Sequence, residues 1–410
     1  MAPTVVRIPI NNVKGGGDYT GEIRIGSQGV VANVILDTGS STLAVVPRVY
    51  NVADDHNVGF TSFAQVVTYG TGGWSGPVLK TTLSMGSGGN QAFVDTFIAI
   101  ADEQLPHNLA PADGILGLAF NSLNAAYDLT AYLTSNQVNP PYTYPWLFPV
   151  RTSMAALRQV EQFLARMTVV DLTPYFTALE EARVTRNIFA FYTLRSTPSM
   201  ASANPEADPL NNGIFVLGGG LDQQDLYTGQ PINVAVLDDL YYNTNLKAVQ
   251  IGDAAPVAVS QLPPSQAKTQ VSNSIVDSGT NSLWLTQEVY RDVVSGLANL
   301  SAEFAALLQE ATSGRAVPQA SLNLGSWPDI KFVMQGADGS DVTLTCAPST
   351  YWQTDAPQAG YAVFQINNGG NLQMSILGLP LFNNYYTVFD RTQNPYGTIS
   401  FAPIATSPGI

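Results

Sequence analysis

A short acidic motif occurs twice in this sequence of 410 residues. It reads Asp37-Thr38-Gly39-Ser40 in the first half of the chain and Asp277-Ser278-Gly279-Thr280 in the second. Each copy follows a short apolar run and continues through two small polar residues to a leucine. One copy alone would indicate a turn. Two matched copies predict a functional site made of one carboxylate from each half of the chain, because a pseudo-two-fold axis can bring the two carboxylates face to face.

Two carboxylates in such an arrangement can activate water. Like charges within hydrogen-bonding distance do not both ionise, so the pair retains one proton. One carboxylate can then deprotonate a water held between them while the other donates to a carbonyl oxygen. The hydroxyl of Ser40 or Thr280 can donate to the adjacent aspartate, which favours its ionised form and fixes its plane. Gly39 and Gly279 allow close approach of backbone.

A second repeated element supports a duplication. Asp113-Gly114-Ile115-Leu116-Gly117-Leu118 follows the first acidic motif, and Ser375-Ile376-Leu377-Gly378-Leu379 follows the second. Between the two pairs, residues 196–213 are rich in Pro, Asn, Ser and Asp, which marks a boundary. We therefore expect two domains, residues 1–196 and residues 197–410.

The elements that would position these motifs are mainly β-strands. Short runs rich in Val, Ile, Tyr and Phe alternate with Gly, Asn, Asp and Pro, which indicates an all-β fold with a few short helices. The clearest predicted strands are 19–25, 30–36, 92–100, 188–194, 214–217 and 385–389. Apolar spacing predicts helices over 154–167, 287–298 and 302–312, with Ser153, Thr286 and Ser301 as their N-caps.

The composition argues against several classes of function. With 17 basic and 31 acidic residues, the formal net charge is -14, so the basic surface that nucleic acid requires is missing. No apolar run approaches the length of a membrane span, so no membrane association is expected. His56 and His107 lack nearby Cys or carboxylate clusters, and we expect neither a metal nor a cofactor. The few basic groups are consistent with work in acid, and equally with an acidic surface that favours solubility.

Cysteine usage bears on the compartment. Cys346 is the only cysteine, so no disulfide can form within the chain and an oxidising compartment is not required. Residues 1–10 lack the cationic and apolar regions of a signal peptide. We expect a cytoplasmic, monomeric protein, whereas a leader removed before Met1 would indicate a secreted or periplasmic one.

These residues resemble the pepsin family of aspartic proteases over nearly the whole chain, from Tyr19-Thr20-Gly21-Glu22-Ile23 to residues 385–391. The resemblance implies a bilobal fold, with two β-barrel-like lobes related by a pseudo-two-fold axis and a central sheet. The single cysteine and the missing leader and basic prosegment are most similar to the bacterial homologues. Protein or peptide substrates and pepstatin-type inhibitors are the implied partners.

The resemblance also implies roles for the motif residues. Asp37 and Asp277 would be the catalytic pair, and the Ile-Leu-Gly strands would thread beneath them. The remaining motif positions would donate hydroxyls to the aspartates (Ser40, Thr280), brace the two loops against each other (Thr38, Ser278) and contact substrate (Gly39, Gly279).

Residues 67–73 resemble the family's flap, a hairpin that closes over the substrate. Without the resemblance they indicate only a Gly-rich hairpin, but their position between the first acidic motif and the first Ile-Leu-Gly favours a flap. Tyr69 would be the flap tyrosine, and the backbone of Gly70 and Thr71 would pair with an extended peptide. The resemblance places Ile35 and Ile115 in the main specificity pocket, which predicts a preference for apolar or aromatic residues at the cleavage site.

Two departures from the family affect the N-terminal domain. Ala44 stands where the family usually has a tryptophan that contacts the flap tyrosine. Trp74 could fill part of that volume, although we expect it to be exposed or packed at an edge. An insertion at about 121–170 contains a segment rich in proline and aromatic residues, 140–149, for which we expect a rigid loop in a satellite cluster rather than a role in the cleft.

The sequence therefore predicts an aspartic endopeptidase that attacks peptide bonds with activated water. The alternative is a pepsin-like binding protein or inhibitor that keeps the fold without the chemistry. Such proteins usually lose an aspartate or a motif glycine, and here both motifs are intact.

Overall fold

The computed structural model describes residues 4–68, 72–104, 109, 111–148, 153–263, 265–266 and 270–405. The chain forms two compact units. Unit 1 contains Met1–Ile8 and Thr20–Arg186, and unit 2 contains Pro9–Tyr19 and Asn187–Ile410. The predicted division after residue 196 lies further along the chain than this one, and no motif indicated that an N-terminal segment, Pro9–Tyr19, joins unit 2.

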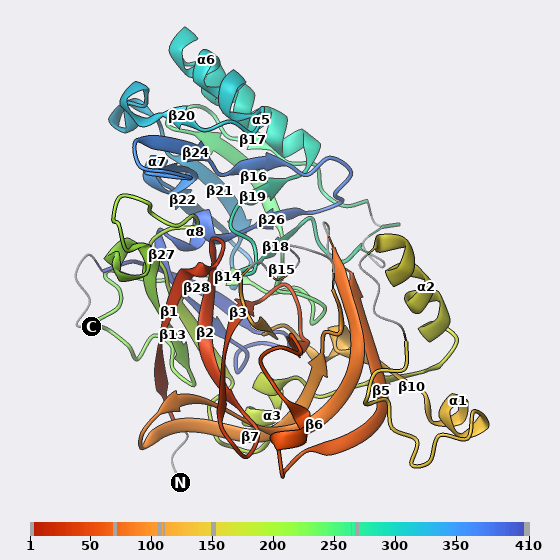
Figure 1. Ribbon diagram of the computed structural model, residues 1–410. Coiled ribbons are helices and arrows are strands. Elements are labelled where there is room, and N and C mark those ends of the chain that lie inside the picture. Colours follow the sequence, from red (N-terminus) through yellow and green to blue (C-terminus); the bar gives the residue numbers. More distant parts are fainter. Residues whose placement is uncertain are drawn as a thin grey trace. The chain divides into compact units, whose positions relative to one another are not determined.

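Unit 1 is dominated by β-strands (Figure 1). Its strands are β2 (Asp18–Ile25), β3 (Val30–Asp37), β4 (Leu43–Val45), β5 (Gly59–Thr68), β6 (Gly73–Ser87), β7 (Asn90–Ile100), β8 (Glu103–Gln104), β9 (Gly114–Gly117), β10 (Ala125–Asp128) and β11 (Thr168–Asp171). Its helices are α1 (Thr130–Ser135), α2 (Met154–Leu164) and α3 (Tyr175–Glu181), with 3-10 turns at Val52–Asp54 and Asn121–Leu123.

Six of these strands close into a barrel. They follow the order β6, β7, β4, β9, β3, β2, and β2 pairs again with β6 through Ile23 and Met85. From Leu79 onward, buried and more exposed residues alternate along β6, as period-two strands require when one face packs on a core. Closure leaves β3 and β9 side by side and parallel inside the unit, with Ile35 opposite Ile115.

Unit 2 contains several sheets. The longest series of paired strands in this unit has the order β1, β13, β12, β27, β28, β14. Three further sheets have the orders β15-β18-β26-β19-β25, β17-β16-β21-β22 and β20-β24-β23. The strands are β1 (Val6–Gly15, in this unit from Pro9), β12 (Ile188–Tyr192), β13 (Asn212–Leu217), β14 (Ile232–Ala235), β15 (Asn243–Thr244), β16 (Leu246–Ile251), β17 (Val257–Ala258), β18 (Ser274–Val276), β19 (Leu283–Leu285), β20 (Val317–Pro318), β21 (Ile330–Gln335), β22 (Asp341–Cys346), β23 (Trp352–Thr354), β24 (Tyr361–Phe364), β25 (Ile366–Asn368), β26 (Ser375–Leu377), β27 (Tyr385–Asp390) and β28 (Thr398–Pro403).

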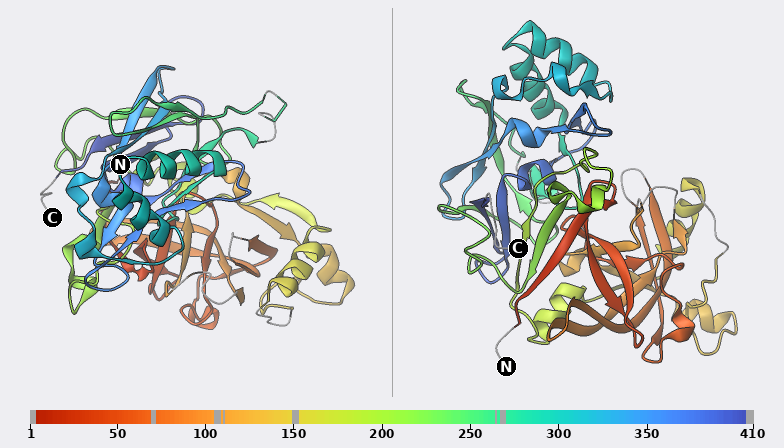
Figure 2. Two further views of the ribbon diagram at one scale, coloured as in Figure 1. Left: turned by 90° about the horizontal axis from the view of Figure 1, so that it is seen from above. Right: turned by 60° about the vertical axis from the view of Figure 1, so that its left-hand side comes forward.

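In the described part of unit 2, helices are fewer than strands. The helices are α5 (Gln287–Ala298), α6 (Ala302–Ala311), α7 (Pro348–Tyr351) and α8 (Leu379–Phe382), with 3-10 turns at Pro205–Ala207, Pro209–Asn211, Gln319–Ser321 and Leu324–Ser326. Helices α5 and α6 lie side by side, teal in Figure 2. Helix α5 also packs against β16. The core beneath β12 and β27 is aromatic, with Phe189 stacked on Phe389 at 4.9 Å between ring centroids.

The predicted strands and helices are confirmed in existence and type, with small shifts at their ends. Ser153 caps α2 and Ser301 caps α6, each accepting a hydrogen bond from a backbone N–H of the first turn. Thr286 occupies the N-cap position of α5 as predicted, but its side chain makes no capping hydrogen bond. Among the described residues, the short helices α1, α3, α7 and α8 went unpredicted. They are too short for apolar periodicity to show.

The insertion near 121–170 forms ordered structure, which includes β10, α1, α2 and β11. We define the satellite cluster as the buried residues Ala64, Leu129, Leu133, Val160 and Leu164 with the partly buried residues that pack on them, among them Tyr132, Trp146, Phe148 and Phe163. This agrees with the expectation of a separate cluster in the first half of the chain. Ala64 belongs to β5, so the cluster also involves the hairpin that β5 begins.

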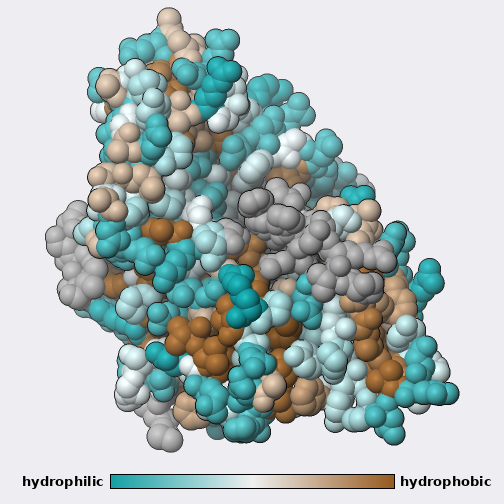
Figure 3. All heavy atoms as spheres, viewed as in Figure 1, coloured by the Kyte–Doolittle hydropathy of each residue, from teal (hydrophilic) through white to brown (hydrophobic). Residues whose placement is uncertain are grey.

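The surface is mixed in character. Polar residues cover much of the face in Figure 3, and apolar patches interrupt them. Exposed large apolar side chains include Phe93, Val169 and Leu300. In the described part of the chain, no helix has the length and apolar content needed to span a bilayer.

Candidate active site

The Asp37 loop is held by three strands of unit 1. β3 ends at Asp37 and runs parallel to β9, with Asp37 opposite Gly117. β4 returns antiparallel on the other side of β9, with Leu43 opposite Leu116. The loop between β3 and β4 therefore crosses over the end of β9, and it carries the Asp37 carboxylate at its start.

The carboxylate of Asp37 is buried and accepts hydrogen bonds from its own loop. The backbone N–H of Gly39 donates to Oδ1 at 2.7 Å. The hydroxyl of Ser40 donates to Oδ2. One donor on each oxygen fixes the plane of the carboxyl group, as the motif predicts.

Gly117 explains why a glycine follows Ile-Leu. A Cβ built on Gly117 would lie 2.4 Å from the Cα of Ser41, closer than any real contact. Two further backbone bonds close the crossing, from the N–H of Gly117 to the carbonyl of Thr42 at 3.0 Å and from the N–H of Leu118 to the carbonyl of Asp37 at 2.7 Å. Only a residue without a side chain fits beneath the loop.

The Asp277 loop repeats this arrangement inside unit 2. β18 runs parallel to β26, with Val276 opposite Leu377, and β19 pairs antiparallel with β26. The N–H of Gly279 donates to Asp277 Oδ1 at 2.9 Å, and the Thr280 hydroxyl donates to Oδ2 at 2.8 Å. Asp277 is also buried.

The second Ile-Leu-Gly has the same steric role as the first. A Cβ on Gly378 would lie 2.3 Å from the carbonyl oxygen of Ser282 and 2.4 Å from that of Thr280. The N–H of Leu379 donates to the Thr280 carbonyl at 2.9 Å. In each unit, a carboxylate that accepts from an amide and a hydroxyl therefore lies over a strand whose Ile-Leu is followed by a glycine. Thr38 and Ser278, which follow the two aspartates, are both buried.

The predicted flap corresponds to the hairpin of β5 and β6. Its strands pair antiparallel as far as Thr68 opposite Gly73. Tyr69, Gly70 and Thr71 lie outside the described residues. The assignment of these three residues to substrate binding stays a prediction.

Trp74 occupies an inner position in unit 1. Its side chain is fully buried in a core cluster, which we call the Trp74 cluster and which contains Ile35, Ala44, Trp74, Val78, Ala112 and Ile115 among others. The expectation that Trp74 would be exposed or packed at an edge is wrong. A large indole and the small Ala44 share one cluster, so Trp74 supplies aromatic volume in the core that contains Ala44.

Sequence reasoning missed a buried polar network beside the Asp37 loop. The side-chain oxygen of Asn124 accepts from the hydroxyl of Thr42 at 3.1 Å and from the amide of Gln65 at 2.9 Å. The Asn124 amide donates to the carbonyl of Leu172 at 3.0 Å. Thr42 belongs to the Asp37 loop and Gln65 to β5, so the network joins the two. Its one sequence signal is a glutamine flanked by the apolar residues Ala64 and Val66 in a strand.

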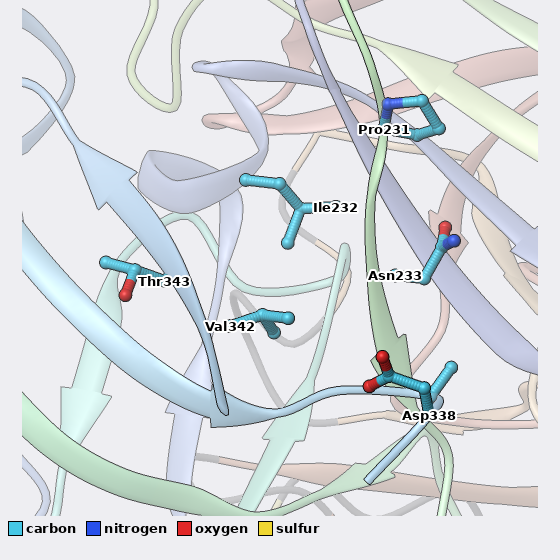
Figure 4. A pocket seen from close by; sticks show the side chains of 7 residues that line it. Pro231, Ile232, Asn233, Asp338, Val342 and Thr343 are labelled. Carbon is cyan, nitrogen blue, oxygen red and sulfur yellow. The ribbon is translucent and has the colours of Figure 1, made fainter. Parts of the chain in front are cut away.

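Two other kinds of site, a metal site and a surface pocket, have less support than the acidic loops in the described part of the chain. Among the described residues, no group of three or more His, Cys, Asp or Glu could hold a metal ion. A surface hollow of about 410 Å³ in unit 2 is lined by Pro231, Ile232, Asn233, Ala337, Asp338, Val342 and Thr343 (Figure 4). Asp338 is its single carboxylate, and that group already accepts from the N–H of Ser340 at 2.9 Å. The hollow therefore lacks a pair of acids.

Comparison with known proteins identifies the family. The profile described as eukaryotic aspartyl protease matches residues 18–140 and 164–404, and these stretches contain both acidic loops. The chain belongs to this family. It is 27% identical to pepsin A of Sus scrofa over 95% of this chain and 82% of that protein. It is 26% identical to pepsin-2B of Gadus morhua, over 95% and 96% respectively.

Membership in the aspartyl protease family gives the coarse function and supports the fold. The chain is a pepsin-like aspartic endopeptidase, a hydrolase of protein or peptide substrates. The mostly β architecture, with the closed barrel of unit 1, is consistent with the pepsin fold. Residues 141–163 lie between the two matched stretches. The part of the insertion outside the family profile is thus narrower than predicted, and it contains most of α2.

Proposed function

We propose that this aspartic endopeptidase cleaves extended polypeptides at acidic pH, with a water molecule activated jointly by Asp37 and Asp277. The observation that supports this most directly is the pair of hydrogen-bond donors that the two carboxylates have in common. In each loop a glycine N–H donates to Oδ1 and a hydroxyl donates to Oδ2. Structural carboxylates on unrelated loops would have no reason to share that pattern.

The proposed reaction balances protons within the pair. The ionised aspartate takes a proton from water, and the resulting hydroxide attacks the carbonyl carbon of the scissile bond. The protonated aspartate donates to the carbonyl oxygen, which gives a gem-diol intermediate. The proton taken from water then passes to the leaving nitrogen and the C–N bond breaks. One gem-diol hydroxyl returns its proton to the aspartate that had donated to the carbonyl oxygen, so a carboxylic acid and an amine leave and the pair again holds one proton. No covalent bond to the protein forms.

The other predicted residues have supporting roles in this proposal. Thr38 and Ser278 brace the loops, and Gly39 and Gly279 let the substrate backbone approach the carboxylates. The backbone of Gly70 and Thr71, with the side chain of Tyr69, binds the substrate as an added strand. Pairing through the backbone explains how one site accepts many sequences.

The preference next to the cleaved bond is proposed to be apolar or aromatic. Ile35 and Ile115 lie opposite each other on β3 and β9, directly before the Asp37 loop. They share the Trp74 cluster with Ala112, whose small side chain leaves room for a large substrate residue. Apolar walls favour apolar side chains because burial releases water from both surfaces.

The test is cleavage of an unfolded protein between about pH 3 and pH 5, where one carboxyl of a coupled pair can stay protonated. We expect cleavage that pepstatin blocks and that Asp37→Ala and Asp277→Ala each abolish. The matched control is Asp338→Ala, an exposed turn carboxylate, which should leave activity unchanged. Absence of cleavage by folded protein across this range would instead favour a binding protein or inhibitor that keeps the fold without the chemistry.

We also propose that the enzyme works as a monomer without association with membranes, in a reducing compartment such as the cytoplasm. The single cysteine supports the compartment, because disulfides within the chain cannot contribute to its stability. Light scattering of the purified chain tests the monomeric state. Fractionation of cells tests the compartment and the absence of membrane association. Dimers in solution, or activity in the membrane or secreted fraction, would contradict them.

A further inference from the structure

Helix α2 lies against the hairpin of β5 and β6, close to the end where the two strands join (Figure 1). The contact at that end is made by Leu157, which is buried. Its Cδ2 atom lies 2.5 Å from the position that a Cβ on Gly73 would take. Gly73 begins β6 and pairs with Thr68, the last residue of β5. Leu157 therefore touches the hairpin at its final strand pair.

The helix is firmly held elsewhere. Its N-terminus is capped by Ser153, whose Oγ accepts from the N–H of Ala156 at 3.3 Å. Val160 and Leu164 belong to the satellite cluster. Phe163, at its C-terminal end, packs edge-on against Tyr132 and Phe148, with ring centroids 4.9 and 5.0 Å away. A helix fixed in this way can act as a rigid support.

The hairpin is in contact with other parts of unit 1 on both of its faces at Gly73 and Trp74. Successive residues of a strand face opposite sides of a sheet, so Gly73 and Trp74 point in opposite directions. Trp74 enters the Trp74 cluster, and Gly73 faces Leu157. Because Gly73 has no side chain, the leucine approaches the backbone of β6 directly. The outer support comes from residues 154–163, which lie outside the family profile.

We propose that α2 positions the β5–β6 hairpin for substrate binding and that Leu157 is the positioning residue. This rests on the proposed function, in which the hairpin contributes to binding the substrate. Without the Leu157 side chain, the hairpin spends part of its time in positions that do not fit the substrate. The apparent affinity for substrate is then reduced in proportion to the fraction of molecules whose hairpin can bind it. The reaction of substrate that is already bound is unchanged. The expected signature is a higher KM with kcat retained.

The decisive experiment compares Leu157→Ala with Leu164→Ala. Both remove the same atoms from buried positions of one helix, but Leu164 lies at the end of α2 away from Gly73. For cleavage of an extended peptide, we expect Leu157→Ala to raise KM about tenfold, as it would if one hairpin in ten stayed competent. Its kcat should change less than about twofold, and Leu164→Ala should raise KM clearly less than Leu157→Ala does, because Leu164 contacts the satellite cluster and not the final strand pair of the hairpin.

A second readout does not depend on activity. Hydrogen exchange of the backbone amides in β5 and β6 should quicken in Leu157→Ala more than in Leu164→Ala, relative to the global stability of each variant. If Leu157→Ala does not fold, Leu157→Val and Leu164→Val provide the same comparison with a smaller truncation. Equal KM values and equal exchange in the matched variants would overturn the positioning role. An inactive wild-type protein would overturn the proposed function instead, and the exchange comparison would still decide whether α2 holds the hairpin.

Discussion

At the scale of single residues, the two acidic loops differ in one informative way. Ser40 donates to Asp37 in the first loop, and Thr280 makes the equivalent bond to Asp277 in the second. The chain thus uses two different hydroxyl residues for one task. The requirement at this position is the hydroxyl group, and the extra methyl of threonine is tolerated in at least one loop.

We expect Ser40→Ala and Thr280→Ala each to lower kcat/KM about 10- to 100-fold, because a carboxylate that loses its hydroxyl donor is no longer held in the reactive orientation. Steady-state cleavage of a peptide at a fixed acidic pH measures the effect. The swaps Ser40→Thr and Thr280→Ser keep the donor and should retain most of the activity. A swap as damaging as its alanine counterpart would show that shape, and not the hydrogen bond, matters.

Asp55 is a buried carboxylate that serves structure. Burial alone would raise the pKa of its carboxyl group, but hydrogen bonds from Thr81, Tyr50, Ser27 and Asn57 outweigh burial and bring that pKa well below its usual range. The hydroxyls of Tyr50 and Thr81 both donate to Oδ2 at 2.5 Å, and the Ser27 N–H donates to Oδ1 at 2.9 Å. The turn at Ser27 and the segment around Tyr50 are thereby joined to β6.

We expect Asp55→Asn to lower the free energy of unfolding by about 2–4 kcal/mol at neutral pH, because the amide cannot accept all of these bonds. A carboxyl with a lowered folded-state pKa stabilises the fold above its unfolded pKa of about 3.9, and this contribution is lost as pH falls through the folded value. The difference from wild type should therefore stay constant from about pH 7 to pH 5 and narrow below about pH 4. Urea unfolding at several pH values measures it, and a difference that widens in acid would refute this role.

At the scale of elements, the strands that end in Ile-Leu-Gly determine whether the acidic loops can form. Gly117 meets the backbone of Ser41, and Gly378 meets the backbone of Ser282. Backbone cannot move aside as a flexible side chain can. Each acidic loop therefore depends on the strand beneath it, although the two are far apart in sequence.

Gly117→Ala and Gly378→Ala should each destabilise the protein by about 3 kcal/mol or more and abolish activity, because the added methyl group forces the loop and the strand apart. Thermal unfolding together with peptide cleavage measures both effects. Gly89→Ala is the matched control, since a Cβ there meets nothing within 4 Å. It should change stability by less than about 0.5 kcal/mol. A Gly117→Ala variant as stable as Gly89→Ala would contradict the steric explanation.

At the scale of the whole molecule, the charge balance bears on behaviour in acid. Once the carboxylates are protonated, the remaining positive charge comes from 17 Lys and Arg and two His. Repulsion among so few cations in 410 residues is weak, which favours retention of the compact state.

We expect the protein to keep its native near-ultraviolet circular dichroism at about pH 3 and to show little change when salt is added, because there is little repulsion for salt to screen. The control is the same measurement at neutral pH. Loss of the near-ultraviolet signal at low salt, with recovery at high salt, would show that charge repulsion governs the acid state.

Much of this molecule could be predicted from patterns within the sequence. The strands and the longer helices follow from local periodicity, and the two acidic loops from a repeated motif. The rest depends on contacts between distant residues. That Trp74 turns inward depends on the surrounding cluster, and the partners of Asn124 come from β5, the Asp37 loop and Leu172. The contact of Leu157 with Gly73 likewise joins an insertion to a hairpin, and no local pattern signals it.

The contacts that close the two acidic loops have a consequence for the chain while it is being synthesised. Leu118 closes the loop of Asp37, and Leu379 closes the loop that begins at Asp277. Contacts between residues far apart in sequence form only after the intervening chain has been made and folded back. The second acidic loop therefore cannot close until the chain has been synthesised as far as Leu379, well beyond Asp277. A growing chain that ends before Leu379 therefore lacks a closed second acidic loop, and under the proposed function we expect it to have no proteolytic activity.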